Sequence, residues 1–362
     1  MYVLSELEKE YGWDKVSKWR ILLVNAGGHS QRLPSASVLG KIFCAFPFGT
    51  PMYQMLEVKL ATYLPFLDRM GPGIYLPPSD TIEVYDLGSN SYEWTFTSPG
   101  FTAIAHPSTL DIGVDHGVYV LEDKNVKGAL AEFRNCLEVL QKPSIDIMYQ
   151  KGAVREAKTN KYIDMTEPWV YSDSCFYFDK DVSRKLIDFY NKHSPLNCEI
   201  DAYGDFLQAL GPRATKEYTK NISNVSTVDP TLGKMREEIF NLLKGTPLNI
   251  VCLNVSQFHH FGTISECLHH FCCNGALRKQ VGFTNCRFSA MLDSSNEHLA
   301  NGAGDPSPPK KSRQNLDEVF EGCVMHSVLK SGSSMAKRSI IEFCNIEIPI
   351  EVGQDCLVSN CE

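Results

Sequence analysis

The chain has 362 residues, and because 43% of them are hydrophobic it can bury a large core in one or two domains. Its formal net charge of −8 gives no basic surface that would predict nucleic-acid binding. Residues 1–19 are amphipathic and charged, unlike a signal peptide, and no apolar run has the length of a membrane span. The 13 cysteines lack regular spacing, which is typical of reduced thiols, so we expect a cytoplasmic protein.

The first predicted strand, residues 19–24, is followed by a glycine turn, Gly27-Gly28. Glycine has no Cβ, so the backbone N–H groups of such a turn can approach an anion closely. In the loop that follows, Arg32 offers a fork of donors that matches phosphate oxygens, and Lys41 adds a mobile positive charge. The spacing is that of neither a P-loop nor a G-x-G-x-x-G turn. The pattern predicts a loop that binds the phosphates of a nucleoside triphosphate.

Strand-like apolar runs alternate with helical patterns up to about residue 274. Further strands are expected at residues 73–76, 118–121, 169–178 and 248–253, and helices at residues 53–66, 182–191 and 235–243. This alternation predicts an α/β fold with a doubly wound, mainly parallel sheet. Sheets of that kind bind ligands beyond the carboxyl ends of their strands, where the glycine turn would lie.

An acidic segment within residues 198–212 contains Glu199, Asp201 and Asp205 and continues as a helix. Asp201 and Asp205 are four residues apart and would therefore share a helical face. Carboxylates are natural partners of sugar hydroxyls, yet the same residue types also cap the N-termini of helices. The pattern leaves sugar binding and helix capping equally open.

The composition changes near the C-terminus. Residues 293–315 are rich in Ser, Asn, Gly, Pro and charge, which predicts a disordered linker. Beyond it, apolar residues recur at every sixth position, with Ser334 in one slot: Val328, Ile340, Ile346, Val352 and Val358. This period favours a short left-handed parallel β-helix over an antiparallel hairpin with chance spacing. The predicted domains are therefore an α/β domain (1–275), a connector (276–322) and a partial β-helix (323–362).

Residues 26–43, AGGHSQRLPSASVLGKIF, match the G-G-x-x-x-R-[LM]-(x)n-K signature of sugar-phosphate nucleotidyltransferases. The long interval between Arg32 and Lys41 is a mark of the fucose branch of that superfamily. Further matching segments are residues 105–121, 141–149, 198–212 and 258–263. The chain therefore resembles the fucose-1-phosphate guanylyltransferase family, whose superfamily often carries a β-helix behind an α/β domain of the nucleotide-diphospho-sugar transferase type.

The resemblance implies that GTP and L-fucose 1-phosphate are converted to GDP-L-fucose and pyrophosphate. It implies that Arg32 and Lys41 hold the β- and γ-phosphates, and that Lys142 bridges the sugar phosphate and the α-phosphate. Such chemistry needs cations and positioning rather than a covalent nucleophile. The nucleotide-binding residues implied are Gly27, Gly28, Ser30 and Gln31, and the sugar-binding residues are Gly117, Glu199, Asp201 and Asp205.

The resemblance also implies Mg²⁺ or Mn²⁺, which would neutralise the triphosphate. Asp80 occupies the slot of the superfamily's first metal aspartate, although an Asp after Pro-Pro also caps turns. The second slot holds His260, whose neutral imidazole is a poorer magnesium ligand, so contact with phosphate or with a metal-bound water is its alternative role. The His- and Cys-rich segment 259–273 lacks the spacing of paired zinc ligands.

Compared with the family, the chain looks truncated at both ends. Two functions therefore stay open: an active nucleotidyltransferase, or a catalytically weak or inactive isoform that acts only in interactions. The sequence indicates neither the oligomeric state nor, beyond the resemblance, the identity of the sugar and the base.

Overall fold

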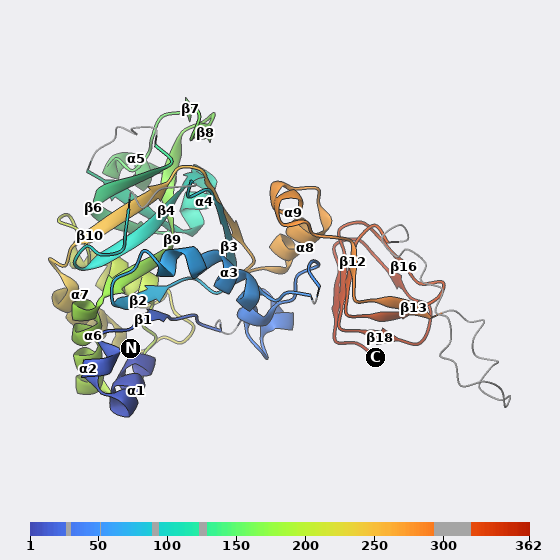
Figure 1. Cartoon of the computed structure of the whole chain (residues 1–362), viewed down its shortest axis with the longest axis horizontal. Helices are drawn as coiled ribbons and strands as arrows, with labels where there is room; N and C mark the ends of the chain where they lie inside the picture. The colour runs from blue at the N-terminus through green and yellow to red at the C-terminus, as the bar shows by residue number, and fades with distance from the viewer. Residues whose placement is uncertain (27–29, 51, 89–93, 123–128, 293–319) are drawn as a thin grey trace. The chain divides into compact units, whose positions relative to one another are not determined.

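The computed structural model describes residues 1–26, 30–50, 52–88, 94–122, 129–292 and 320–362 (Figure 1). The chain divides into two compact units. The first unit comprises Met1–Val24, Thr62–Pro78 and Glu83–Phe258, and the second comprises Asn25–Ala61, Ser79–Ile82 and His259–Glu362. The predicted boundary at residue 275 does not coincide with this division, because the loop after the first strand belongs with the C-terminal segments.

The first unit is built on a sheet with the strand order β1-β2-β9-β4-β10-β6-β5. In that order, the strands are β1 (Arg20–Leu22), β2 (Gly73–Leu76), β9 (Trp169–Asp179), β4 (Phe101–Thr109), β10 (Leu248–Leu253), β6 (Ala131–Gln141) and β5 (Gly117–Leu121). Only the pairs β1–β2 and β4–β10 are parallel; the other neighbours in this order are antiparallel. The predicted mainly parallel sheet is therefore wrong, and the sheet is mixed.

Strand direction could not be predicted because a strand buried on both faces is a continuous apolar run whichever way its neighbours run. β9 shows this well, since ten of its eleven residues are buried although it runs antiparallel to both β2 and β4. β5 and β6 are consecutive antiparallel strands, which need no crossover helix.

Two hydrophobic cores lie on opposite faces of the sheet, because successive strand residues point to opposite sides. On β9, Phe176 and Phe178 belong to one core, and Cys175 and Tyr177 to the other. Residues of α1 (Tyr2–Tyr11), α6 (Lys180–His193) and α7 (Leu232–Leu243) complete the first core, and residues of α3 (Met55–Leu67) complete the second. Helices on both faces support the doubly wound class, which stays a prediction.

The predicted helices are confirmed as α3, α6 and α7, and the predicted strands as β1, β2, β5, β9 and β10, with small shifts at their ends. β4 and β6 were not predicted. The shorter elements of the first unit, two of which extend into the second, are α2 (Trp13–Val16), β3 (Thr81–Tyr85), α4 (Leu110–Asp115), α5 (Ile145–Lys151), β7 (Lys158–Thr159), β8 (Asp164–Met165), η3 (Ala202–Leu207), η4 (Lys216–Lys220) and β11 (Ser256–His260).

The C-terminal part of the second unit consists of three parallel ladders, β12-β14-β17-β20, β13-β15-β18 and β16-β19 (Figure 1). Their strands are β12 (Cys286–Arg287), β13 (Ala290–Leu292), β14 (Cys323–Met325), β15 (Val328–Lys330), β16 (Ser334–Met335), β17 (Ile340–Glu342), β18 (Asn345–Ile346), β19 (Glu351–Val352) and β20 (Leu357–Ser359). This parallel pairing contradicts the antiparallel hairpin. It supports the β-helix, whose handedness stays a prediction.

The repeat of these ladders is 17 residues, since Val324 pairs with Ile341 and Ile341 with Val358. Three six-residue sides would give a repeat of 18, so the predicted period is wrong at one side of each turn. As a result, the buried residue on that side is Leu329 and not Val328. The corners of the turns carry left-handed residues, since His326, Arg338 and Phe343 have positive φ values of 46°, 59° and 52°.

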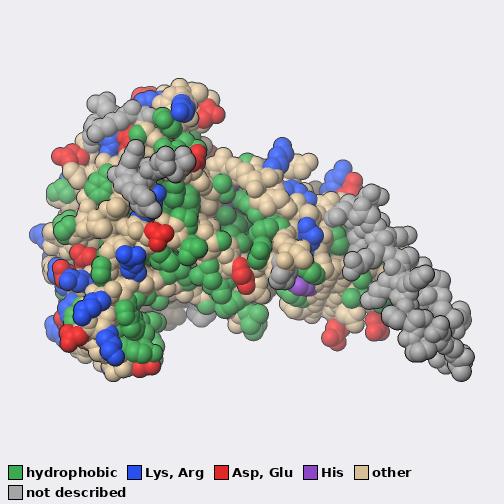
Figure 2. All heavy atoms as spheres, viewed as in Figure 1, with side chains coloured by type: hydrophobic (Ala, Val, Ile, Leu, Met, Phe, Trp, Pro, Cys, Tyr) green, Lys and Arg blue, Asp and Glu red, His purple; other side chains and the backbone are tan. Residues whose placement is uncertain are grey.

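The predicted linker, residues 293–315, lies outside the described residues. Within the described ranges, no helix combines the length and the apolar character that crossing a membrane requires. On the face of the first unit that Figure 2 shows, basic and acidic side chains are interspersed.

Candidate functional site

The predicted phosphate-binding loop lies in the second unit, where it forms two short 3-10 turns, η1 (Pro34–Ala36) and η2 (Lys41–Phe43). The Ile42 amide donates to the Ala26 carbonyl at 3.2 Å, and the Ile42 side chain is buried. Gly40 has a φ of 98°, and a Cβ there would lie 2.4 Å from the Ala26 oxygen. Only glycine fits this position, which sets the point from which the Lys41 side chain begins.

The predicted nucleotide-binding residues are described only in part. Gly27 and Gly28 lie outside the described residues. Ser30 is buried, whereas Gln31 and Arg32 are exposed. The Arg32 carbonyl accepts a hydrogen bond from the Ile264 amide at 3.0 Å, which ties the arginine turn to the start of α8 (Ile264–Cys272).

Lys41 begins a chain of alternating charges that sequence reasoning did not foresee. Its Nζ lies 2.7 Å from Asp80 Oδ2, and His260 Nε2 lies 3.3 Å from the same oxygen. His260 Nδ1 in turn lies 2.9 Å from Glu266 Oε1. These side chains are mostly shielded from water; that of Lys41 is 12% exposed and that of Asp80 19%. These ion pairs therefore hold the Lys41 ammonium in one place.

The pKa values of these side chains result from two opposing effects: burial disfavours the charged forms, and ion pairing favours them. Burial alone would lower the pKa of His260, but hydrogen bonds to Asp80 and Glu266 outweigh it and raise the pKa to about 9. Burial alone would raise the pKa of Asp80, yet His260 and Lys41 hold it well below its usual range. The pKa of Glu266 is lowered as well, because hydrogen bonding to His260 and Thr263 outweighs burial. At neutral pH Asp80 and Glu266 are therefore negatively charged and His260 is positively charged.

The motif FHHFGT positions His260 through its last residues. A Cβ at Gly262 would lie 2.1 Å from the His260 ring, so the glycine makes room for the imidazole. Thr263 caps α8 by accepting from the Glu266 amide at 3.2 Å, and Glu266 Oε2 accepts from the Gly262 amide at 3.0 Å. This exchange is a variant of the capping box, and it leaves Glu266 Oε1 for the histidine.

The residues present do not fit a magnesium site made of protein ligands. Asp80 Oδ2 is already occupied by the Lys41 ammonium and by the His260 imidazole, whose raised pKa of about 9 keeps it positively charged at neutral pH. Among the residues that the structure describes, no three His, Cys, Asp or Glu side chains form a metal-binding group. The geometry favours Asp80 as the counter-ion that fixes Lys41, and its predicted role as a metal ligand stays untested.

In the first unit, Gly117 and Lys142 meet at the open end of the β5–β6 hairpin. The Lys142 amide donates to the His116 carbonyl at 3.0 Å, and Lys142 has a φ of 48°, which is uncommon for a non-glycine residue. The next amide, that of Gly117, donates to Asp173 Oδ1 at 2.9 Å. The consecutive residues His116 and Gly117 therefore anchor Lys142 and Asp173, and the carboxylate of Asp173 was not predicted from the sequence.

Asp173 lies within β9 and is 6% exposed. Burial raises its pKa to about 7, against opposing effects of the Gly117 hydrogen bond and the Lys142 charge. A signal was present in the sequence, because a charged residue in the middle of the apolar run WVYSDSCFYF is unusual for a buried strand. Buried groups with perturbed pKa values are candidates for function.

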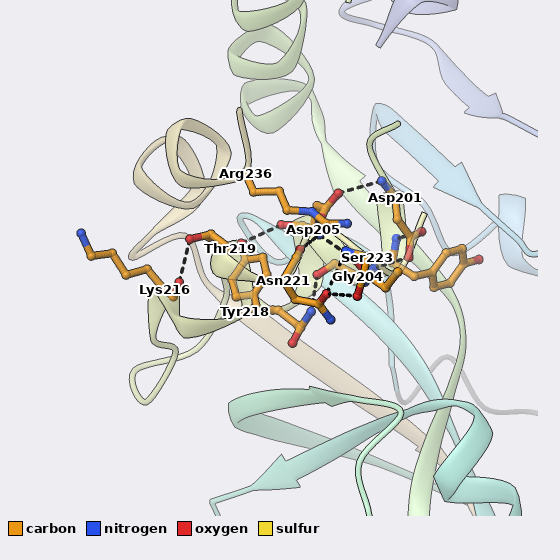
Figure 3. A network of polar contacts seen from close by, with 12 residues as sticks. Asp201, Gly204, Asp205, Lys216, Tyr218, Thr219, Asn221, Ser223 and Arg236 are labelled. Atoms are coloured by element: carbon orange, nitrogen blue, oxygen red, sulfur yellow. Dashed lines mark hydrogen bonds and ion pairs between the residues drawn. The ribbon is translucent and has the colours of Figure 1, made fainter. Parts of the chain in front are cut away.

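Asp201 and Asp205 cap and brace the π-helical turn η3 rather than sharing the face of an α-helix (Figure 3). Asp201 accepts from the amides of Tyr203 and Gly204, each at 3.0 Å. Asp205 Oδ2 accepts from the Asp201 amide at 2.8 Å, and Oδ1 lies 2.7 Å from Arg236 Nε, an ion pair without the angle of a hydrogen bond.

These contacts favour a structural role for Asp205, whose side chain is 2% exposed and that of its partner Arg236 1%. Burial raises the pKa of Asp205 to about 6, although its hydrogen bond to the Asp201 backbone and the Arg236 charge oppose the rise. Asp201 and Glu199 are exposed, and Glu199 accepts from the Ser226 amide at 2.9 Å. Helix capping therefore accounts for Asp201, and sugar binding by this segment stays a prediction.

The comparisons with known proteins agree with the motifs. The family model of the fucose pyrophosphorylase domain matches residues 13–362. A mouse protein named fucose-1-phosphate guanylyltransferase is 43% identical over 358 residues, 96% of this chain and 57% of its own length. The human protein of the same name is 43% identical over 367 residues, 98% of this chain and 57% of its own length.

An Arabidopsis thaliana protein named bifunctional fucokinase/GDP-fucose pyrophosphorylase is 24% identical over 149 residues, 38% of this chain and 14% of its own length. The chain thus spans a little over half the length of the two mammalian relatives. The match of the family model to nearly the whole chain, together with the mammalian identities, shows that this chain belongs to the fucose pyrophosphorylase family.

Proposed function

We propose that the chain transfers the guanylyl group of GTP to L-fucose 1-phosphate, forming GDP-L-fucose and pyrophosphate. An oxygen of the sugar phosphate attacks the α-phosphorus, and the bond from that phosphorus to the bridging oxygen of the β-phosphate breaks. The electron pair leaves with pyrophosphate, so negative charge grows on the leaving group. Fixed cations near the triphosphate therefore accelerate the step.

The observation that supports this proposal most strongly is the fixed position of Lys41. A free lysine side chain samples many rotamers. Lys41, in the phosphate loop of the family, instead ends 2.7 Å from the shielded carboxylate of Asp80. Holding the ammonium in advance avoids reorganisation during the reaction. We propose that Lys41 and Arg32 bind the β- and γ-phosphates and that Lys142 binds the sugar phosphate.

The same proposal includes GTP and L-fucose 1-phosphate as the small-molecule partners and a divalent cation as the companion of the triphosphate. Magnesium or manganese would neutralise phosphate oxygens when bound. All 13 cysteines are free thiols in the structure, which supports a reducing, cytoplasmic location.

The test is an initial-rate assay of the purified chain with a panel of substrates. GTP with L-fucose 1-phosphate should give the highest kcat/KM, above ATP or UTP and above mannose 1-phosphate or glucose 1-phosphate. Lys41→Ala should abolish most of this rate, and Lys9→Ala, at an exposed ion pair, should not. A folded chain without GDP-L-fucose formation would favour the interaction-only isoform.

A further inference from the structure

Asp173 is the most unusual charged group of the first unit outside the roles assigned above. Its carboxyl group is almost completely buried, and it contacts no Lys or Arg side chain in the part of the chain that the structure describes. Its side-chain hydrogen bond comes from the Gly117 amide. Burying a carboxylate without a paired cation is costly, so such a group persists where it has a task.

The surrounding chain is built to admit this carboxylate. A Cβ at Gly117 would lie 2.3 Å from Asp173 Oδ2. The close approach is therefore possible only because residue 117 is glycine. Two residues further along β5, Tyr119 is 1% exposed, and its hydroxyl has no hydrogen-bond partner among the described residues. Residues 117 and 119 point to the same face of the strand, so the carboxylate and the hydroxyl lie on one side of β5.

Two charges of opposite sign act on Asp173. Lys142 is anchored to His116, next to the glycine that binds Asp173, and its charge acts on the carboxyl group. Asp201 also acts on it, with the opposite sign. A phosphate is attracted to Lys142 and repelled by the two carboxylates, whereas a neutral hydroxyl is a good donor to a carboxylate that lacks a cation.

We propose that Asp173 is a specificity-determining residue that accepts a hydrogen bond from a ring hydroxyl of the sugar 1-phosphate. This inference rests on the proposed function and deepens it by assigning a residue to the sugar ring. The phosphate of the substrate then lies toward Lys142 and the ring toward Asp173, so the two groups fix the orientation of the sugar. The alternative is a purely structural carboxyl that closes the start of β5.

The test compares wild type with Asp173→Asn, which keeps an oxygen for the Gly117 amide but loses the charge. KM for L-fucose 1-phosphate should rise about 10-fold or more, as expected for a lost hydrogen bond to a charged group, while KM for GTP stays within about 2-fold. Ser174→Ala is the matched control, since this buried neighbour on β9 bonds His106 at 2.8 Å and should leave both KM values unchanged. Melting temperatures confirm that all three proteins are folded.

Deoxy analogues of fucose 1-phosphate, each lacking one ring hydroxyl, identify the contact. Wild type should lose about 10-fold in kcat/KM on one analogue, and Asp173→Asn should treat that analogue like the parent sugar. Equal changes in both KM values, or a normal KM for the sugar phosphate, would overturn the proposal. Titration of L-fucose 1-phosphate without GTP separates the two proposals: wild-type binding that Asp173→Asn loses supports this one even where turnover is absent. If wild type does not bind the sugar phosphate, the inference is wrong.

Discussion

Asp173→Asn should make the protein more stable at alkaline pH although it impairs sugar binding. The pKa of Asp173 is raised from 3.8 to about 7, because burial disfavours the charged form. The native state therefore binds a proton more tightly than the unfolded state, and stability falls as pH rises from about 4 through about 7. At about 1.4 kcal/mol per pH unit, the loss reaches at most about 4 kcal/mol above pH 7. Asparagine carries no charge and removes this loss.

Urea unfolding of both proteins at pH 5, 6, 7 and 8 measures the effect. The difference in unfolding free energy should favour Asp173→Asn increasingly from pH 5 to pH 8, by roughly 2 to 4 kcal/mol. Subtracting the two curves cancels the contribution of Asp205, whose pKa is also raised, to about 6. Parallel curves, or a variant that becomes less stable with rising pH, would refute the reasoning. A residue whose replacement stabilises the fold and weakens sugar binding is serving function at the expense of stability.

Three further predictions concern the remaining charged groups. Lys41→Ala should lower kcat by about 100-fold or more, because it removes a charge that acts on the leaving pyrophosphate, and a cooperative thermal unfolding transition is the control that the variant is folded. EDTA should stop the reaction. Asp80→Asn should lower the rate, while the Mg²⁺ concentration that gives the half-maximal rate stays the same. A sharply raised Mg²⁺ requirement in this variant would show that Asp80 is a metal ligand. Arg236→Met should lower the unfolding free energy by about 3–5 kcal/mol in urea titrations, because it leaves Asp205 buried without its cation, and a loss below about 1 kcal/mol would contradict a structural ion pair.

The sequence predicted those parts of the molecule that are encoded locally. The run before the glycine turn, the apolar strand at residues 73–76 and the amphipathic helix at 182–191 all have patterns that depend on near neighbours, and all three are present. Strand direction depends on distant partners, so the mixed sheet could not be predicted. The 17-residue repeat escaped notice because the register depends on which residues pair across turns: Ile341 pairs with Val358, whereas a strict six-residue period predicts a repeat of 18.

The candidate site divides in the same way. Lys41 and Asp80 were predicted from motifs, but their direct contact joins residues 39 positions apart and exists only in the folded chain. His260 was predicted as a departure from a metal site, and the Glu266 partner that makes it cationic was not foreseen. Asp173 stands out in its apolar run, but its partners could not be read from the sequence: Gly117 begins β5 and Lys142 follows the end of β6, and only the fold places them near Asp173.

The measurement that tests the central claim most directly is a ³¹P NMR spectrum of the purified chain with GTP, L-fucose 1-phosphate and Mg²⁺. The account predicts that GTP and sugar phosphate signals fall together while pyrophosphate and a sugar nucleotide diphosphate rise in equal amounts, and that Lys41→Ala suppresses all four changes. Formation of GDP with inorganic phosphate, or an unchanged spectrum with a folded protein, would contradict the claim that this chain is a nucleotidyltransferase.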